Sequence, residues 1–173
     1  MATNRKTLNW LDFDRLVDQL IPQFDVEFDV LLMITRGGIV PGGALAEALN
    51  LTTILTASVD FPPITVEMTE SERARLQAFP KFLQFPESDL LLGKKVLVVD
   101  DVWGSGRTIT AVQNRVRAAG GVPFSCVLHF NPLRNLFGSS RPDYYADLTD
   151  IYIIYPWEIQ RGMHFSMLPG KPL

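Results

Sequence analysis

Uninterrupted apolar runs that end in polar or glycine-rich residues are the dominant pattern along this chain. The segments 30–34 and 96–99 contain only aliphatic residues and methionine. Such runs are typical of strands that are buried on both faces of a sheet. The segments 51–59, 124–130 and 151–155 are rich in β-branched and aromatic residues, and they predict three further strands.

Helical spacing of apolar residues appears between these runs. Apolar residues recur at i, i+3, i+4, i+7 and i+8 from Phe13, which predicts an amphipathic helix. A second helix is predicted over about 44–49, with Asn50 at the left-handed position that often ends a helix. A third starts near Ile109 and stops before the glycine pair at 120–121. This alternation predicts one doubly wound α/β domain, residues 1–173, with a mostly parallel central sheet and ligand loops at the carboxyl ends of the strands.

The segment that follows the 96–99 strand combines an acidic pair with a glycine loop. Asp100 and Asp101 come first, and Gly-Ser-Gly-Arg-Thr at 104–108 leads into a helix. Glycines let backbone N–H groups approach an anion beside the positive end of a helix, while the hydroxyls of Ser105 and Thr108 can donate to the same phosphate. The carboxylates suit sugar hydroxyls or Mg²⁺. The alternative is an ordinary strand-to-helix turn with capping residues.

A second strand–loop–helix unit carries an arginine. The strand at 30–34 ends in Thr35-Arg36-Gly37-Gly38, where glycines permit close approach and Arg36 adds a positive charge. The alternative is that Arg36 is a surface residue which forms an ion pair there. Two such units in one small chain favour a pair of anion-binding loops.

The sequence Val-Val-Asp-Asp-Val-x-x-Ser-Gly-x-Thr at 98–108 resembles the phosphoribosyl-pyrophosphate (PRPP) signature of type I phosphoribosyltransferases. The resemblance extends over about residues 10–158. It implies that Asp100 and Asp101 hold the ribose hydroxyls and help to bind Mg²⁺. It also implies that the loop cradles the 5′-phosphate, through Gly104, Ser105, Gly106, Arg107 and Thr108.

The arginine loop resembles the pyrophosphate loop of the purine enzymes, above all the xanthine–guanine and archaeal hypoxanthine–guanine kinds. This implies that Thr35, Arg36 and Gly37 bind pyrophosphate, with Arg36 joining the two aspartates as a catalytic residue. It further implies a strained peptide between Thr35 and Arg36, with a cis bond as one option.

Tyr-Pro-Trp-Glu at 155–158 resembles a Phe-Pro-Trp-Glu/Asp segment of the same purine enzymes. It implies that Tyr152 stacks on the base, that the backbone at Ile153 reads the base edge, that Trp157 belongs to the base site and that Glu158 helps to hold Mg²⁺. The residues alone favour a simpler explanation, in which Tyr152 and Trp157 are aromatics that pack the edge of a core.

Two positions depart from the purine enzymes. The family places an Asp beside the purine where this chain has Gly104, which has no side chain to move a proton. It also places a Lys on the purine 6-oxo group where this chain has Asn131, which offers a hydrogen bond but no charge. His129 lies two residues away and could compensate, although a lone histidine at a strand end is more often structural.

The resemblance implies a Mg²⁺-dependent transfer of phosphoribose from PRPP to a nucleobase, most of all a purine, with release of pyrophosphate and formation of a nucleoside 5′-monophosphate. The alternative is a PRPP- or nucleotide-binding regulator without catalysis, which the two departures would also fit. A generic interaction domain does not explain the three motifs. The family further implies a homo-oligomer, dimer or tetramer, and a small hood over the site built from the segments 61–92 and 151–173.

Composition and charge limit the partners and the cellular location that we expect for this protein. The net charge is −3 and no more than two basic residues are adjacent, which argues against nucleic-acid partners. The single Cys126 lies in an apolar run and is expected to be a buried thiol. No apolar run approaches 18 residues and no basic-then-apolar leader is present, so a cytoplasmic protein without a membrane partner is expected.

Overall fold

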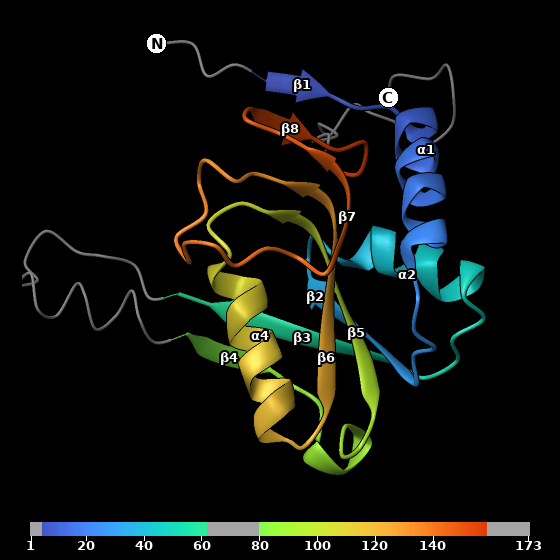
Figure 1. Cartoon of the computed structure of the whole chain (residues 1–173), viewed down its shortest axis with the longest axis vertical. Coiled ribbons are helices and arrows are strands. Elements are labelled where there is room, and N and C mark those ends of the chain that lie inside the picture. The colour runs from blue at the N-terminus through green and yellow to red at the C-terminus, as the bar shows by residue number, and fades with distance from the viewer. Residues whose placement is uncertain (1–4, 62–79, 159–173) are drawn as a thin grey trace, which may run out of the picture.

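A six-stranded sheet, centred on β2 and β5, carries the fold of residues 5–61 and 80–158, which are the parts described by the computed structural model (Figure 1). The strand order is β4-β3-β2-β5-β6-β7, and every pair is parallel except β3 with β4. The strands are β2 (Val30–Thr35), β3 (Ile54–Asp60), β4 (Lys81–Gln84), β5 (Lys95–Trp103), β6 (Val122–Phe130) and β7 (Tyr144–Leu148). The predicted single α/β domain with a mostly parallel sheet is confirmed.

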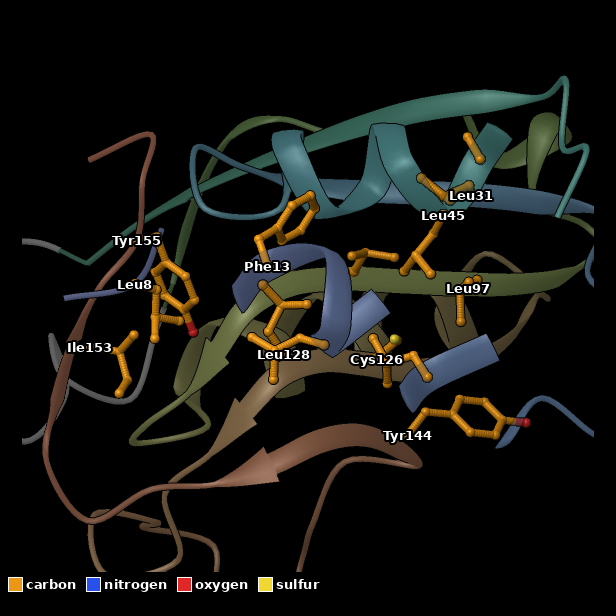
Figure 2. Packing of buried hydrophobic residues seen from close by; sticks show 14 residues of the cluster. Leu8, Phe13, Leu31, Leu45, Leu97, Cys126, Leu128, Tyr144, Ile153 and Tyr155 are labelled. Carbon is orange, nitrogen blue, oxygen red and sulfur yellow. The ribbon is translucent and has the colours of Figure 1, made fainter. Parts of the chain in front are cut away.

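Helices cover both faces of this sheet, which explains the uninterrupted apolar runs (Figure 1). On one face, α1 (Trp10–Leu20) and α2 (Ile39–Ala48) pack on Leu31, Leu97 and Leu128 (Figure 2). On the other face, α4 (Arg107–Ala118) packs on alternate residues of the same strands. Two short 3₁₀ turns, η1 (Ile21–Gln23) and η2 (Ser88–Leu90), complete the described helices. As expected, Cys126 is fully buried, and burial raises the pKa of its thiol.

The helix expected from about residue 44 begins at Ile39, one and a half turns earlier. Pro41, which would break a helix interior, lies in the first turn of α2, where the missing N–H has no intrahelical partner to lose. Asn50 has φ of 52°, so the predicted left-handed residue after this helix is confirmed. The early start matters because it brings α2 directly behind the Arg36 loop.

The strand expected at 151–155 forms, but it lies outside the central sheet. β8 (Tyr152–Ile154) pairs in parallel with β1 (Arg5–Thr7) in a separate two-stranded sheet. Within the segment expected to form a hood, residues 81–84 instead join the central sheet as its antiparallel edge strand. Residues 85–92 of the same segment contain η2 and the fully buried Leu91, which belongs to the core on the α4 face of the sheet. The parts of the predicted hood at 62–79 and 159–173 lie outside the described residues. Across the described ranges, no helix has the length and apolar character needed to span a membrane.

Candidate functional site

The strand order reverses between β2 and β5, so the connections that leave these two neighbours run in opposite directions across the sheet. In open α/β sheets, ligands bind at the carboxyl ends of such neighbouring strands. β2 leads into the Arg36 loop, while β5 extends past the expected 96–99 strand, contains Asp100 and Asp101 near its carboxyl end and leads into the glycine loop. The two motifs singled out from the sequence therefore meet at one point of the fold.

Gly37 shows how closely the two motifs approach each other. A Cβ placed on this residue would lie 2.6 Å from Cγ of Asp101 and 2.7 Å from Oδ1 of Asp100. Non-bonded atoms do not approach a Cβ so closely, so only glycine allows the Arg36 loop to rest on the acidic pair. The peptide between Thr35 and Arg36 is cis, one of the forms that the resemblance implied, and the Arg36 side chain is exposed.

Burial, and then repulsion by a neighbouring carboxylate, raises the pKa of each carboxyl group of the acidic pair. For Asp100, burial is the largest cause and the charge of Asp101 is the second, and together they hold its pKa well above the usual value. Burial and then the charge of Glu158 raise the pKa of Asp101 to about 6. Among the described residues, neither aspartate forms an ion pair. The pair is thus suited to bind a cation or sugar hydroxyls.

These carboxylates also fit a magnesium ion delivered by a phosphate ligand. No three His, Cys, Asp or Glu side chains are grouped as a ready-made metal site within residues 5–61 and 80–158. Mg²⁺ in phosphate sites needs no such group, because it keeps several waters and takes only one or two carboxylates besides the phosphate oxygens. Asp100 and Asp101 can supply those carboxylates, and the charge of Glu158 is felt at Asp101.

Trp103 packs against the glycine loop and restricts its conformation. Gly106, which caps α4, has φ of +79°, and a Cβ on it would lie 2.4 Å from Nε1 of Trp103. That indole N–H donates to Oδ1 of Asn135 at 3.2 Å, and the Ser105 carbonyl accepts from the Leu136 N–H at 3.1 Å. The loop therefore presents the first turn of α4 in a defined orientation. The guanidinium of Arg107 lies 4.0 Å from the ring centre of Phe61.

Gly104 and Asn131, the two departures, have different environments. A Cβ on Gly104 would meet nothing within 4 Å, so a side chain fits at this position. Asn131 is 3% exposed, and its Oδ1 accepts hydrogen bonds from the N–H groups of Leu133 and Arg134. Its carboxamide oxygen therefore closes a turn, which leaves only the NH₂ group for a ligand.

The predicted base-site residues lie on and after β8. Tyr152 is 46% exposed, and the guanidinium of Arg5 lies 5.7 Å from its ring centre. Ile153 is buried and pairs with Lys6 of β1. Trp157 stacks on Tyr155 at 4.7 Å and meets the ring of Phe13 edge-on at 5.4 Å, which is the packing role that the residues alone also allowed.

Sequence reasoning missed a buried hydrogen-bond chain beside the acidic pair. The hydroxyl of Tyr155 donates to the carbonyl of Asp101 at 2.9 Å and lies 2.8 Å from Nδ1 of His129. Burial lowers the pKa of His129 to about 4, so the imidazole is neutral at physiological pH. Its only signal in the sequence was Tyr155 at a position where the resembled segment has phenylalanine.

Comparisons with known proteins agree with this geometry. The model of the family described as "Phosphoribosyl transferase domain" matches residues 9–146. An adenine phosphoribosyltransferase of Geobacter metallireducens is 30% identical over 115 residues, which cover 66% of each protein. The chain thus spans just under two thirds of that relative's length.

Two solved structures have the same fold. A purine phosphoribosyltransferase from Pyrococcus horikoshii superposes with a TM-score of 0.74 at 25% identity, covering 92% of this chain and 97% of that one. A xanthine–guanine–hypoxanthine phosphoribosyltransferase from Helicobacter pylori gives 0.71 at 17% identity, covering 90% and 95%. The second likeness is one of fold alone.

Proposed function

This chain belongs to the phosphoribosyl transferase domain family, and we propose that it transfers the phosphoribosyl group of PRPP to a purine base. Pyrophosphate is released and a nucleoside 5′-monophosphate is formed. The observation that carries the proposal is the contact at Gly37, because it joins two anion-binding loops and two aspartates in one site.

The glycine loop binds the 5′-phosphate of PRPP. Its backbone N–H groups and the positive end of α4 favour a dianion, and the hydroxyls of Ser105 and Thr108, beside the start of that helix, donate to it. Asp100 and Asp101 accept hydrogen bonds from the ribose hydroxyls at the end of β5. The sugar is thereby held with C1′ towards the Arg36 loop.

Transfer breaks the bond between C1′ and pyrophosphate and forms a bond from C1′ to a ring nitrogen of the base, whose proton is released to solvent. Positive charge develops on the ribose, and negative charge develops on the leaving group. The aspartates stabilise the first charge, while Thr35, Arg36 and Gly37 bind the second. Positioning supplies much of the rate, since the reaction joins two reactants held in one site.

Mg²⁺ belongs to the proposal as the ion that accompanies pyrophosphate. When bound, it neutralises charge on the leaving phosphates. Asp100, Asp101 and Glu158 are the residues proposed to hold it, directly or through water. The burial of the two aspartates and the repulsion of Asp101 by Glu158 support this assignment.

Adenine is the base that we assign as acceptor. The Geobacter relative is an adenine phosphoribosyltransferase. In this chain Gly104 cannot move a proton, and Asn131 offers an uncharged donor in place of the lysine that contacts a 6-oxo group. Both features weaken the recognition of oxopurines. Tyr152 supplies an exposed ring for stacking on the purine.

The test is pyrophosphate release from PRPP and Mg²⁺ with a panel of adenine, guanine, hypoxanthine, xanthine and pyrimidine bases. We expect release with adenine at a kcat/KM at least about tenfold above that of any oxopurine. PRPP binding is measured in parallel by calorimetry. If PRPP binds and no base releases pyrophosphate, the proposal of a transferase is wrong and the chain is a PRPP-binding regulator.

A side chain restored at position 104 should change the choice of base. We expect Gly104→Asp to raise kcat/KM for hypoxanthine by at least about tenfold, because a carboxyl group beside the purine can exchange a proton with it. A Cβ at position 104 meets nothing within 4 Å, so the substitution causes no clash at that atom. Gly104→Asn is the matched control, having the same shape without the acid. Equal kinetics in the two variants would show that proton transfer at this position does not limit oxopurine turnover.

A further inference from the structure

The side chain of Tyr155 joins the C-terminal segment to the acidic end of β5. Tyr155 is 1% exposed and its hydroxyl reaches the carbonyl oxygen of Asp101, 54 residues away in sequence. Figure 2 shows this tyrosine beside Leu8 and Ile153, at the end of the core that lies under β1 and β8. β8 has no hydrogen-bonded neighbour in the six-stranded sheet, so side-chain contacts of this kind determine where the segment lies.

Asp101 lies where β5 has lost one of its two neighbouring strands. The pairing of β2 with β5 ends at Met33 and Val99, whereas β6 continues alongside as far as Trp103. Beyond Val99, β6 is the only described strand that runs beside β5. The carbonyl of Asp101 accepts its hydrogen bond from the Tyr155 hydroxyl.

His129 orients that hydroxyl. A tyrosine hydroxyl has one proton, and here it is donated to Asp101, so its oxygen must accept from Nδ1 of His129. The hydrogen-bond pattern thus assigns the proton of the neutral imidazole to Nδ1. His129 is 2% exposed, and both partners are buried where water does not replace a lost bond. The two residues form one unit.

The main chain of Tyr155 holds Glu158, the third acidic residue of the site. Its N–H donates to Oε2 of Glu158 at 2.9 Å, and its carbonyl accepts from the N–H of Glu158 at 3.0 Å. The ring stacks on Trp157, which packs on α1 and resists rotation of the segment. One residue thus anchors Glu158 through its backbone and Asp101 through its side chain.

We propose that Tyr155, oriented by His129, is a positioning residue that sets Glu158 relative to Asp101 for the binding of PRPP with its divalent cation. The proposal rests on the function proposed above. It assigns no chemistry to Tyr155, which acts through the two carboxylates. The hydroxyl is the feature that this chain adds, since the segment it resembles has phenylalanine there.

The test compares two tyrosines of the core, each of which loses one hydroxyl that donates a hydrogen bond. Tyr155→Phe removes the bond to Asp101, and Tyr144→Phe removes a bond of 2.7 Å to Asp25 at the opposite end of the same core (Figure 2). We expect Tyr155→Phe to weaken PRPP binding in the presence of Mg²⁺ by about tenfold, as loss of one good hydrogen bond would. Binding in EDTA should be unchanged. Tyr144→Phe should alter neither value, measured by calorimetry.

A second pair of variants tests the role of His129 independently of Tyr155. His129→Asn keeps a donor near Nδ1 and should retain most of the Mg²⁺-dependent affinity, whereas His129→Leu should lose as much as Tyr155→Phe. This pair decides the matter if Tyr155→Phe does not fold. Equal affinity in Tyr155→Phe and Tyr144→Phe, or an equal loss with and without Mg²⁺, would overturn the positioning role. If the wild-type chain binds no PRPP, the proposed function itself fails.

Discussion

Asp101→Asn should lower kcat/KM for PRPP by at least about 100-fold, which is the size of effect seen when one electrostatic partner of a transition state is removed. Asparagine keeps the shape of the side chain but loses the negative charge that binds Mg²⁺ and stabilises the ribosyl cation. Pyrophosphate release with adenine is the measurement. Asp150→Asn, which changes an exposed aspartate beyond β7, is the control and should leave the rate unchanged.

The same variant should be more stable than the wild type at neutral pH in EDTA. The pKa of Asp101 is about 6 in the folded chain, above its value of 3.8 in an unfolded chain. The folded state therefore binds the proton more tightly, and stability falls as pH rises from about 4 to 6. Removing this group should gain about 1–3 kcal/mol at pH 8 and little at pH 4. Urea unfolding at the two pH values measures the gain.

A loss of activity together with a gain in stability would mark Asp101 as a residue kept for binding rather than for folding. A loss of both would instead mean that the Asp101 side chain holds the end of β5 together. The Asp101→Asn substitution leaves the backbone carbonyl of residue 101 in place. Tyr155 can therefore still donate to it, and the positioning contact is not disturbed.

Gly37→Ala should reduce kcat/KM for PRPP by about 100-fold while the chain still folds. The added Cβ would lie 2.6 Å from Cγ and Oδ1 of Asp101, so the Arg36 loop and the acidic pair must move apart. A displacement of this kind between a leaving-group loop and the sugar site costs about two orders of magnitude in rate. Steady-state kinetics with PRPP as the varied substrate measures the loss.

Gly43→Ala is the matched control for this substitution. Gly43 lies in α2, exposed, and a Cβ there meets nothing within 4 Å. Alanine in a helix is favoured over glycine by about 0.5–1 kcal/mol, so this variant should be slightly more stable and fully active. Unchanged activity in Gly37→Ala would mean that the two loops do not act on one ligand.

Much of the fold could be predicted because the central strands are buried on both faces. Such strands must be continuously apolar, and the segments 30–34 and 96–99 therefore stood out. Three short strands escaped prediction: β1, β4 and β7. All three lie at the edge of a sheet, and β1 is fully exposed, so their residues follow no hydrophobic period. Whether such a segment forms a strand depends on its pairing with a neighbouring strand.

The candidate site likewise contains parts that could be predicted from the sequence and parts that could not. Its anion-binding loops could be predicted because phosphate chemistry requires glycines, hydroxyls and a helix start at a fixed spacing along one segment. The Asn131 side chain could not be interpreted in this way, since its role in closing the 131–134 turn depends on backbone N–H groups that composition does not reveal.

The sequence by itself determined the strands that form the centre of the sheet, the two loops that follow them and the acidic pair near the carboxyl end of β5, because each depends on residues close together in the chain. Only the tertiary structure decided that Gly37 touches the acidic pair and that Tyr155 links Asp101 to His129. These contacts join segments that are tens of residues apart. They arise from the strand order and from the packing of β8 beside β1, and no local pattern specifies either one.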